Sequence, residues 1–589
     1  MWQPLVILPF LVPPHPHAFN WTTALLPAQS PLIGATVAIV DQFFTSECNK
    51  LYIRRRATNK RNVRFQIDLI EAILTTIEPD ICVQLETIQA RPLNRSRVHN
   101  VFFVDDFEAF GRISEKMKVQ TYDYSGYFLI IVTDSSRNSF NTVQQIMDDL
   151  WSHYAINVGV LLSYDDSPGD AYYYTYFPFG EGYCEQVHPL LWKLFRKGRF
   201  VDSTREFYPK KLRNFYGCPL KVATFDIPPF MMMDPGFDGK VSNLNGLDGI
   251  ITRVLSKLLN FTLNVVFVEP PEWGTTGKIG SWKGASRLVL DRVVNFTIGY
   301  WAMTYNRNRY MGSTFSYYTS LMIIVVPPGQ PYGSLEQLIL PFGHTTCIII
   351  RTSYIGSLFK LHQLHVNKTA PKIIPEYTAA GYHIRMARNF SYVFEAFPQF
   401  SRHLKQTNLT SFLTREIDDL QHSSTRYILL IPTEAVAYMN RMLTKRGKLL
   451  RVGGDRVYLS KLTIYSQRSS PVLNPFNYIL GLMSTAGMID QWASQFSQSV
   501  FLKDSLSSRD PRKLTITQII GCLELLVFGL AVSSVVLAFE CFVDSYHGEN
   551  GLQRARSVEE RVERIELFKV TRRVLHKAIK ERKKATDST

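Results

Sequence analysis

The sequence contains no spacing that is typical of a metal site or a catalytic centre. Neither Cys-x-x-Cys nor His-Glu-x-x-His occurs, and no P-loop, Gly-x-Ser-x-Gly or Gly-x-Gly-x-x-Gly pattern is present. No combination of nucleophile, base or metal ligands therefore predicts an enzyme. We expect no catalytic residue, no bound metal and no cofactor.

A basic stripe of the kind that binds nucleic acid is also missing. The chain has 66 Lys and Arg against 50 Asp and Glu, a formal net charge of +16, which by itself would suit nucleic acid, anionic lipid or acidic ligands. The two signs are interleaved along the chain, however, and no zinc-finger, RRM or helix-turn-helix pattern occurs. We therefore expect no nucleic-acid partner.

Long apolar runs are almost absent, and residues 514–539 form the one run that exceeds the about 20 residues needed to cross a bilayer. Glu524 is its single ionisable residue. We expect one C-terminal transmembrane helix here, with a buried soluble helix as the alternative. Twelve Lys and Arg lie between Arg554 and Lys584, so the positive-inside rule predicts that residues 542–589 form a cytoplasmic basic tail.

Seven Asn-x-Ser/Thr sequons all precede this run, which indicates that the chain before it is extracellular and glycosylated. Residues 1–18 form a possible signal peptide, although they lack a basic start, and an apolar N-terminal strand is the alternative. These features together predict a plasma-membrane protein with an extracellular N-terminus and a cytoplasmic C-terminus. The seven sequons are at Asn20, Asn94, Asn260, Asn295, Asn367, Asn389 and Asn408.

Cysteine is scarce, with seven residues in 589. Four lie in the part that we predict to be extracellular, and an even number there suits an oxidising compartment, although spacing does not define their pairing. Cys522 and Cys541 lie in or beside the apolar run, where we expect free thiols. The four extracellular cysteines are Cys48, Cys82, Cys184 and Cys218.

Residues 19–215 alternate apolar strands with helices. VFFVDD, YFLIIVTD and INVGVLLSY have the pattern of buried strands that end in polar residues, and a helix with one apolar face lies between the last two. This βαβ order predicts an amino-terminal α/β domain of the doubly wound kind.

A second α/β pattern occupies residues 216–340 and resumes over 367–505. The first segment opens with the strand LKVATFDIPPF, the helix DGIITRVLSKLLNF and the strand LNVVFVE. The second contains the strand YILLI and an expected helix over 477–496. The two segments flank residues 341–366, where a short apolar run ends at Arg351.

Seven motifs in a fixed order resemble the ionotropic glutamate receptors, and within them the divergent chemosensory ionotropic receptors of arthropods. The resemblance extends over roughly 216–541 and implies that 216–340 (S1) and 367–505 (S2) form a bilobed, periplasmic-binding-protein-like clamshell. It further implies a ligand-gated cation channel subunit that binds an odorant or tastant and assembles with co-receptor subunits. The motifs are LKVATFDIPPF, GLDGIITRVLSKLLNF, GSWKG, TYNRNRYMGSTFSYY, SLEQLILPF, TSYIGSLF and LTITQIIGCLELLVFGL.

The resemblance also implies a ligand site. Amino-acid-binding members carry a Thr-Tyr-x-Arg run whose arginine holds the ligand carboxylate through a bidentate fork. If the family's run is aligned on TYNR, its threonine and arginine are Thr304 and Arg307. If it is aligned on the downstream TFSYY, the equivalent arginine is Arg309. For either arginine the alternative is a solvated surface residue. In IPTEAV, Thr433 takes the place of the family's acidic ligand contact, and Glu434 is the nearest carboxylate. An acid, aldehyde or other small odorant or tastant therefore fits as well as an amino acid.

The family's pore is where the chain departs from the resemblance. TSYIGSLF resembles the end of the pore-lining helix, but only eight residues separate Phe342 from Arg351, where a first span and a pore loop would lie. Eight residues cannot form two crossings and a filter, so we interpret 341–366 as a remnant of the pore-helix region. Three hypotheses remain: a channel subunit whose pore segment is omitted, a single-pass ligand-binding decoy or partner subunit, and a solute-binding protein without channel activity.

Overall fold

The computed structural model describes residues 30–328, 371–502, 516–546 and 564–575, together with Glu336 and Arg561. Contacts divide the chain into one unit of Met1–Pro328 with Ala370–Ser507 and a second of Gly329–Thr369 with Ser508–Thr589. The possible signal peptide at 1–18 and the pore-helix remnant at 341–366 lie outside the described residues. Short gaps within the ranges fall at 48, 78–80, 87–95, 119–120, 137–138, 168, 203, 236–240, 275–281, 391, 396–397, 421–424, 445–448 and 562–563.

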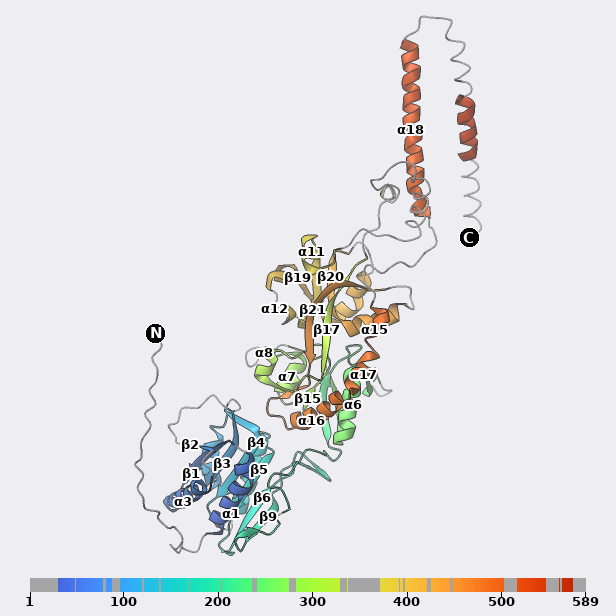
Figure 1. The fold of residues 1–589 in the computed structure, drawn as a ribbon. Coiled ribbons are helices and arrows are strands. Elements are labelled where there is room, and N and C mark those ends of the chain that lie inside the picture. Colours follow the sequence, from blue (N-terminus) through green and yellow to red (C-terminus); the bar gives the residue numbers. More distant parts are fainter. Residues whose placement is uncertain are drawn as a thin grey trace, which may run out of the picture. The chain divides into compact units, whose positions relative to one another are not determined.

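An eight-stranded sheet organises the chain up to about residue 215 (Figure 1). Its order is β10-β9-β6-β5-β4-β3-β1-β2; β1 to β5 pair in parallel, and β6, β9 and β10 extend the sheet antiparallel. The strands are β1 (Lys50–Arg56), β2 (Cys82–Glu86), β3 (Arg97–Val104), β4 (Tyr122–Val132), β5 (Asn157–Leu162), β6 (Asp170–Thr175), β9 (Leu190–Arg196) and β10 (Arg199–Phe200).

Helices cover both faces of this sheet. α1 (Pro31–Ile39) and α3 (Lys60–Thr76) pack on the face that carries Val101 and Phe103 of β3. α4 (Phe107–Ser114) and α5 (Ser139–Ser152) pack on the face that carries Phe102 and Val104. Alternate residues of one strand enter different cores because side chains point to opposite faces with a period of two. The mixed α/β architecture therefore includes a sheet wound on both sides, as the βαβ order predicts.

Two five-stranded sheets form the rest of the first unit, and we call them the first and second lobes. The first has the order β14-β11-β15-β22-β16 and the second β19-β18-β20-β17-β21. The first-lobe strands are β11 (Pro219–Thr224), β14 (Thr262–Phe267), β15 (Phe296–Thr297), β16 (Met311–Ser313) and β22 (Tyr465–Gln467). The second-lobe strands are β17 (Tyr318–Val326), β18 (His383–Ala387), β19 (Leu404–Thr407), β20 (Tyr427–Pro432) and β21 (Arg451–Leu462).

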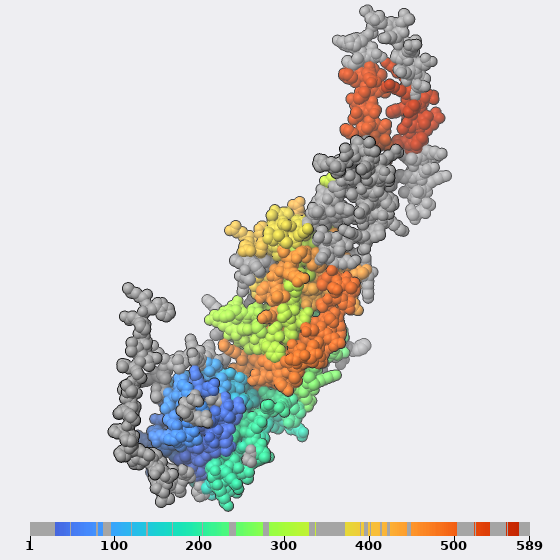
Figure 2. Space-filling model, viewed as in Figure 1, coloured from blue at the N-terminus to red at the C-terminus, as the bar shows by residue number. Residues whose placement is uncertain are grey.

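The lobes exchange strands, so neither coincides with one of the predicted halves. β17 comes from S1 but pairs with β20 and β21 in the second lobe, while β22 comes from S2 but pairs with β15 and β16 in the first. The two chain segments that connect the lobes lie side by side. They are joined by the hydrogen bonds Thr314 N–H to Ile464 O (3.0 Å) and Tyr317 N–H to Leu462 O (3.0 Å). We call residues 314–317 and 463–464 the hinge. In Figure 2, residues from after 430, in orange, accordingly lie beside green residues from before 328.

Helices flank each lobe. α6 (Gly246–Leu259) packs against α16 (Leu473–Thr485) and α17 (Met488–Ser494), and α15 (Thr433–Thr444) packs against β17 and β20. One helix was expected over 477–496, but Gly487 adopts a positive φ of 68° and divides it into α16 and α17. A glycine tolerates this left-handed conformation, so the predicted single helix was wrong at that position.

Shorter elements complete the first unit. They are η1 (Val40–Phe44), α2 (Thr45–Glu47), β7 (Phe179–Gly180), β8 (Tyr183–Cys184), β12 (Met232–Pro235), β13 (Val241–Asn245), α7 (Gly284–Leu290), α8 (Tyr305–Tyr310), α11 (Ile374–Ala379), η2 (Arg388–Phe390), α12 (Tyr392–Glu395), η3 (Pro398–His403), α13 (Leu409–Ser411), η4 (Phe412–Glu416), α14 (Ile417–Asp419) and η5 (Ser499–Phe501).

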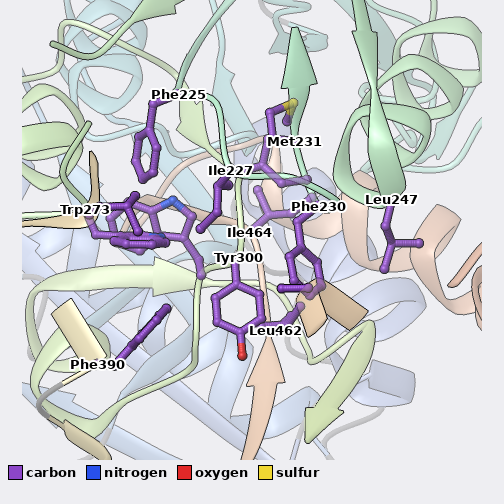
Figure 3. Packing of buried hydrophobic residues seen from close by; sticks show 14 of the residues in the cluster. Phe225, Ile227, Phe230, Met231, Leu247, Trp273, Tyr300, Phe390, Leu462 and Ile464 are labelled. Carbon is purple, nitrogen blue, oxygen red and sulfur yellow. The ribbon is translucent and has the colours of Figure 1, made fainter. Parts of the chain in front are cut away.

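A shared core joins the lobes (Figure 3). Trp273 and Tyr300 of the first lobe contact Phe390 of the second, with ring centroids 5.6 and 5.7 Å apart. Phe225 and Phe230 support these rings from the first lobe, at 4.9 Å from Trp273 and 4.4 Å from Tyr300. A mixed α/β fold with several sheets and two lobes that meet at a hinge fits a ligand-binding clamshell.

The second unit contains α18 (Ile516–Tyr546) and a helix over 564–575. α18 exposes large apolar side chains, among them Val527 (65% exposed), Phe528 (68%) and Val535 (68%). Across the part of the chain that the structure describes, no helix combines the length and the apolarity that a membrane crossing requires. The predicted span at 514–539 is therefore not supported by the structure.

Candidate functional site

Arg307 lies in α8 at the side of the first lobe that faces the second. Thr304 is the N-cap of this helix, and its Oγ1 accepts the backbone N–H of Arg307 at 3.3 Å. The backbone N–H of Thr304 donates to the Tyr465 hydroxyl of β22 at 3.2 Å. A threonine cap satisfies a backbone donor that the helix leaves free, so the Thr-Tyr-x-Arg run fixes the start of α8 and thereby the place of Arg307.

The Arg307 side chain is buried, with 8% exposed. Its Nη1 donates to the Ala302 carbonyl at 2.9 Å, and its guanidinium lies 4.7 Å from the ring centroid of Trp301 and 5.9 Å from that of Tyr392. Tyr392 belongs to the second lobe, where its hydroxyl lies 3.1 Å from Ser460 Oγ of β21. The guanidinium is therefore enclosed by rings from both lobes.

No carboxylate among the described residues forms an ion pair with Arg307. Burial lowers its pKa, yet a guanidinium stays charged. The Trp301 ring below it is fully buried, and its Nε1–H has no hydrogen-bond partner. Buried arginines are almost always paired, so these donors suit an anionic or carbonyl oxygen that the described part of the protein does not supply.

Thr433 and Glu434 open α15 and are bound to β17. Thr433 Oγ1 donates to the Leu321 carbonyl at 2.8 Å. Glu434 is buried, and its two oxygens accept from the Tyr318 hydroxyl at 2.7 Å and from Ser320 Oγ at 2.6 Å. Burial raises the Glu434 pKa. Both carboxylate oxygens are thus occupied within the second lobe, and neither Thr433 nor Glu434 shares a hydrogen bond with Arg307 or Thr304.

Arg309 lies on the outer side of α8. Its side chain is exposed, and its guanidinium is 5.7 Å from the Tyr310 ring centroid. Its carbonyl accepts from Arg468 Nη1 at 3.3 Å. The structure therefore places Arg307 inside and Arg309 outside, two residues apart.

Asp248 is a buried carboxylate that the sequence reasoning missed. It lies in the first turn of α6, fully buried, and accepts the Tyr300 backbone N–H and the Tyr317 hydroxyl, each at 2.7 Å. Burial raises its pKa to about 6. The sequence did contain an indication of this residue, because Asp248 lies at helical spacing from the apolar Ile251 and Leu255 and therefore on the buried face of α6. Through Tyr317 this carboxylate anchors the hinge to the first lobe.

The described sequons differ in accessibility. Asn260 and Asn408 are exposed, at the C-cap of α6 and the N-cap of α13. Asn295 is partly buried: its Oδ1 accepts from Lys221 N–H at 2.7 Å, and its Nδ2 donates to Glu185 at 3.2 Å. The side chain of Asn389 and the sequons at Asn20, Asn94 and Asn367 lie outside the described residues.

Two of the four cysteines that were predicted to be extracellular form a disulfide. Cys184 pairs with Cys218 across 34 residues of chain. Cys82 and Cys541 are free and exposed, while Cys48 and the side chain of Cys522 lie outside the described part. Across the residues that the structure describes, no group of three or more His, Cys, Asp or Glu is placed to hold a metal.

Residues 26–214 match a family model described as "Putative ionotropic receptor, ligand binding domain". This match supports an ionotropic receptor family, and a ligand-binding receptor domain implies a small-molecule ligand. It covers the amino-terminal domain rather than the clamshell, although the motifs of the sequence resemblance lie after residue 216. No curated protein matches the chain.

Proposed function

We propose that this chain is a ligand-binding ionotropic receptor subunit whose clamshell holds a small ligand with a carboxylate or a polar carbonyl group. One observation carries the proposal. Arg307 is buried between rings of both lobes, and no described carboxylate pairs with it. A ligand oxygen beside its guanidinium and the unpartnered Trp301 Nε1–H would satisfy both donors.

Such a ligand would favour closure of the lobes. Arg307 and Trp301 belong to the first lobe and Tyr392 to the second, so a ligand that contacts all three interacts more strongly with the closed clamshell than with an open one. That differential affinity shifts the equilibrium toward the closed state, and residues 314–317 and 463–464 provide the hinge at which the lobes turn.

The finer assignments rest on the sequence. The motif order favours the arthropod chemosensory branch, with an odorant or tastant as ligand and co-receptor subunits as partners. The sequons and the basic tail favour a plasma-membrane protein with the N-terminus outside and the C-terminus in the cytoplasm. The apolar run of the sequence at 514–539 favours a membrane anchor there. We propose no enzymatic activity.

Because the segment between Phe342 and Arg351 is too short for a pore, we propose that this chain does not conduct by itself. The alternatives are then a channel subunit whose pore segment is omitted, a single-pass ligand-binding decoy or partner subunit, and a solute-binding protein without channel activity. Ligand-evoked current from oocytes that express this chain alone would contradict the proposal. Current that appears only with a co-receptor would favour the partner subunit over the other two.

The ligand site is tested by binding of short carboxylic acids and their matched alcohols to the full chain. Arg307→Ala should weaken binding of the acid by roughly 1.5 to 3 kcal/mol, the value of a hydrogen bond to a charged group. Arg309→Ala is the matched control, because it removes an exposed arginine two residues away and should change the affinity little. Equal, negligible effects of both variants would refute the carboxylate site.

A further inference from the structure

A cavity of about 690 Å³ lies where the amino-terminal domain meets the first lobe. The amino-terminal domain supplies Tyr154 and the residues 210–213, and the first lobe supplies Leu258 at the end of α6 and the segments 468–471 and 473–475 with 477–479. Arg307, Trp301 and Tyr392 do not line it. This junction pocket is therefore separate from the proposed ligand site around these three residues, which we call the cleft. Its volume falls within the range of small-molecule sites, roughly 300 to 1,000 Å³.

The walls of the junction pocket are fastened together by specific contacts. Arg292 of the first lobe donates from Nη1 to the Ser152 carbonyl at 3.0 Å and lies 5.2 Å from the Tyr154 ring centroid. The Cys184–Cys218 disulfide connects the same two parts of the chain. These contacts make the pocket a built feature of the first unit and not a gap between loosely joined domains.

Positive charge dominates the lining. Lys210, Lys211, Arg213 and Arg468 face a single acidic residue, Asp123. Three of these cations are exposed, whereas Lys211 is buried, with 5% exposed.

Lys211 has only neutral partners. Its Nζ donates to the Ile156 carbonyl and to Thr175 Oγ1, each at 2.7 Å, and lies 4.8 Å from the Tyr176 ring centroid. No described carboxylate pairs with it, and burial lowers its pKa to about 7. An anion nearby would stabilise the charged form of such a lysine.

The lobe side of the pocket is partly apolar. Leu258 is 56% exposed and Tyr478 is 67% exposed, and both line the cavity. Water-exposed apolar groups beside a cluster of cations suit a ligand that has both an anionic group and an apolar body.

We propose that the junction pocket binds a small organic anion with an apolar body, of the aryl or alkyl carboxylate class. The carboxylate lies among the basic side chains of Lys210 and Arg468, and the apolar body lies against Leu258 and Tyr478. Because the two walls come from different domains, the bound anion stabilises the junction between them. This site is additional to the cleft and does not depend on the function proposed for it.

The probe is 4-(4-fluorophenyl)butanoate, and its fluorine NMR signal reports binding to the full chain in lipid nanodiscs, with empty nanodiscs as the blank. The double variant Lys210→Gln/Arg468→Gln removes two exposed cations and should weaken binding roughly ten- to a hundredfold. The matched control, Arg199→Gln/Arg112→Gln, removes two exposed cations of the amino-terminal domain outside the pocket and should leave the affinity within about twofold. The uncharged analogue 4-(4-fluorophenyl)butanol should bind the unmodified chain at least roughly tenfold more weakly than the acid.

A second pair of variants separates this site from the cleft. Leu258→Asn should weaken binding of the probe without a change of charge. The same loss should appear when Leu258→Asn is made in the Arg307→Ala background, because Arg307 does not line the pocket. Loss of binding in Arg307→Ala together with full binding in the double variant would place the probe in the cleft and overturn the proposal. Failure of the unmodified chain to bind the probe, or equal affinities for the acid and the alcohol, would overturn it as well. The Arg307 site is judged separately, by the difference between Arg307→Ala and Arg309→Ala.

Discussion

The amino-terminal domain and the clamshell assemble their sheets in different ways. Every strand of the eight-stranded sheet comes from one continuous segment, from β1 to β10. Each lobe of the clamshell instead takes one strand, β17 or β22, from the other half of the chain. The amino-terminal sheet is complete once its own segment has folded. The two sheets of the clamshell are instead connected by two adjacent chain segments, and such a connection allows the lobes to move relative to each other.

The same difference appears in the buried cations of the two regions. Lys211 has three donors, and two acceptors of its own domain lie at 2.7 Å. Arg307 has five donors, and the Ala302 carbonyl is the acceptor that its guanidinium reaches within the described residues. Lys211 thus uses two of its three donors within its own domain, while most of the donors of Arg307 are left for a ligand.

The largest expected effect concerns the covalent link between the two regions. Cys184→Ser/Cys218→Ser opens a loop whose ends are 34 residues apart, and the chain-entropy model predicts a loss of roughly 3 to 4 kcal/mol in the free energy of unfolding. Urea unfolding followed by tryptophan fluorescence measures it. As the control, Cys82→Ser removes an exposed free thiol and should leave the free energy of unfolding almost unchanged. If the double variant lost no more stability than Cys82→Ser, the disulfide would not link the amino-terminal domain to the clamshell.

The next effect concerns the hinge of the clamshell. Burial raises the Asp248 pKa from 3.8 to about 6, so between these values the folded chain keeps a proton that the unfolded chain has released. Stability therefore falls as the pH rises through this window. The contribution amounts to roughly 2 to 3 kcal/mol at neutral pH, and Asp248→Asn should remove this pH dependence.

The measurement is the difference in unfolding free energy between about pH 4 and about pH 7, compared between the unmodified chain and Asp248→Asn. The amide does not titrate, so any change that it makes to the hydrogen bonds with Tyr300 and Tyr317 is the same at both pH values and cancels in the difference. Asp291→Asn is the control, because it removes a surface carboxylate that pairs with Arg287 at 3.0 Å. It shows how much the pH dependence of the unfolding free energy changes when one exposed carboxylate is lost. The same pH dependence in Asp248→Asn and in the unmodified chain would contradict a buried, proton-binding carboxylate at the hinge.

The two buried cations give the third test. Lys211→Met removes the hydrogen bonds of Lys211 Nζ to the Ile156 carbonyl and to Thr175 Oγ1, and should cost roughly 1 to 3 kcal/mol in the absence of any ligand. Arg307→Met loses one hydrogen bond and also removes an unpaired buried charge, so its effect should stay within about 1 kcal/mol. Thermal unfolding of the ligand-free chain compares them. A cost of Arg307→Met above that of Lys211→Met would mean that the protein itself satisfies Arg307.

Elements with strong local patterns could be predicted from the sequence. The apolar runs VFFVDD and YFLIIVTD became β3 and β4, and the amphipathic run DGIITRVLSKLLNF became α6. The strand exchange could not be predicted, because β22 has three residues and its place depends on partners far away in the chain, in β15 and β16. Short strands carry too little periodicity to show which sheet they join.

The candidate site was predictable in part. The TYNR run indicated Thr304 and Arg307, but the sequence could not decide between Arg307 and Arg309, because the choice depends on the direction in which α8 leaves its cap. Glu434 was proposed near the ligand for its charge alone. Its partners Tyr318 and Ser320 are more than a hundred residues away in the chain, and tertiary contacts of that kind leave no local pattern.

The smallest effect is expected for the outer arginine of α8. Arg309 is exposed, and its guanidinium has the Tyr310 ring at 5.7 Å as its neighbour, an interaction worth about 0.5 to 1 kcal/mol at most on a surface. Arg309→Ala should therefore change the free energy of unfolding by at most about 1 kcal/mol, in the same range as Arg112→Ala, which breaks an exposed pair with Glu108 worth about 0.3 to 0.5 kcal/mol. Urea unfolding of both variants makes the comparison. A loss above about 1.5 kcal/mol for Arg309→Ala alone would show that this arginine is packed in solution, and the assignment of the inner position to Arg307 would then have to be reversed.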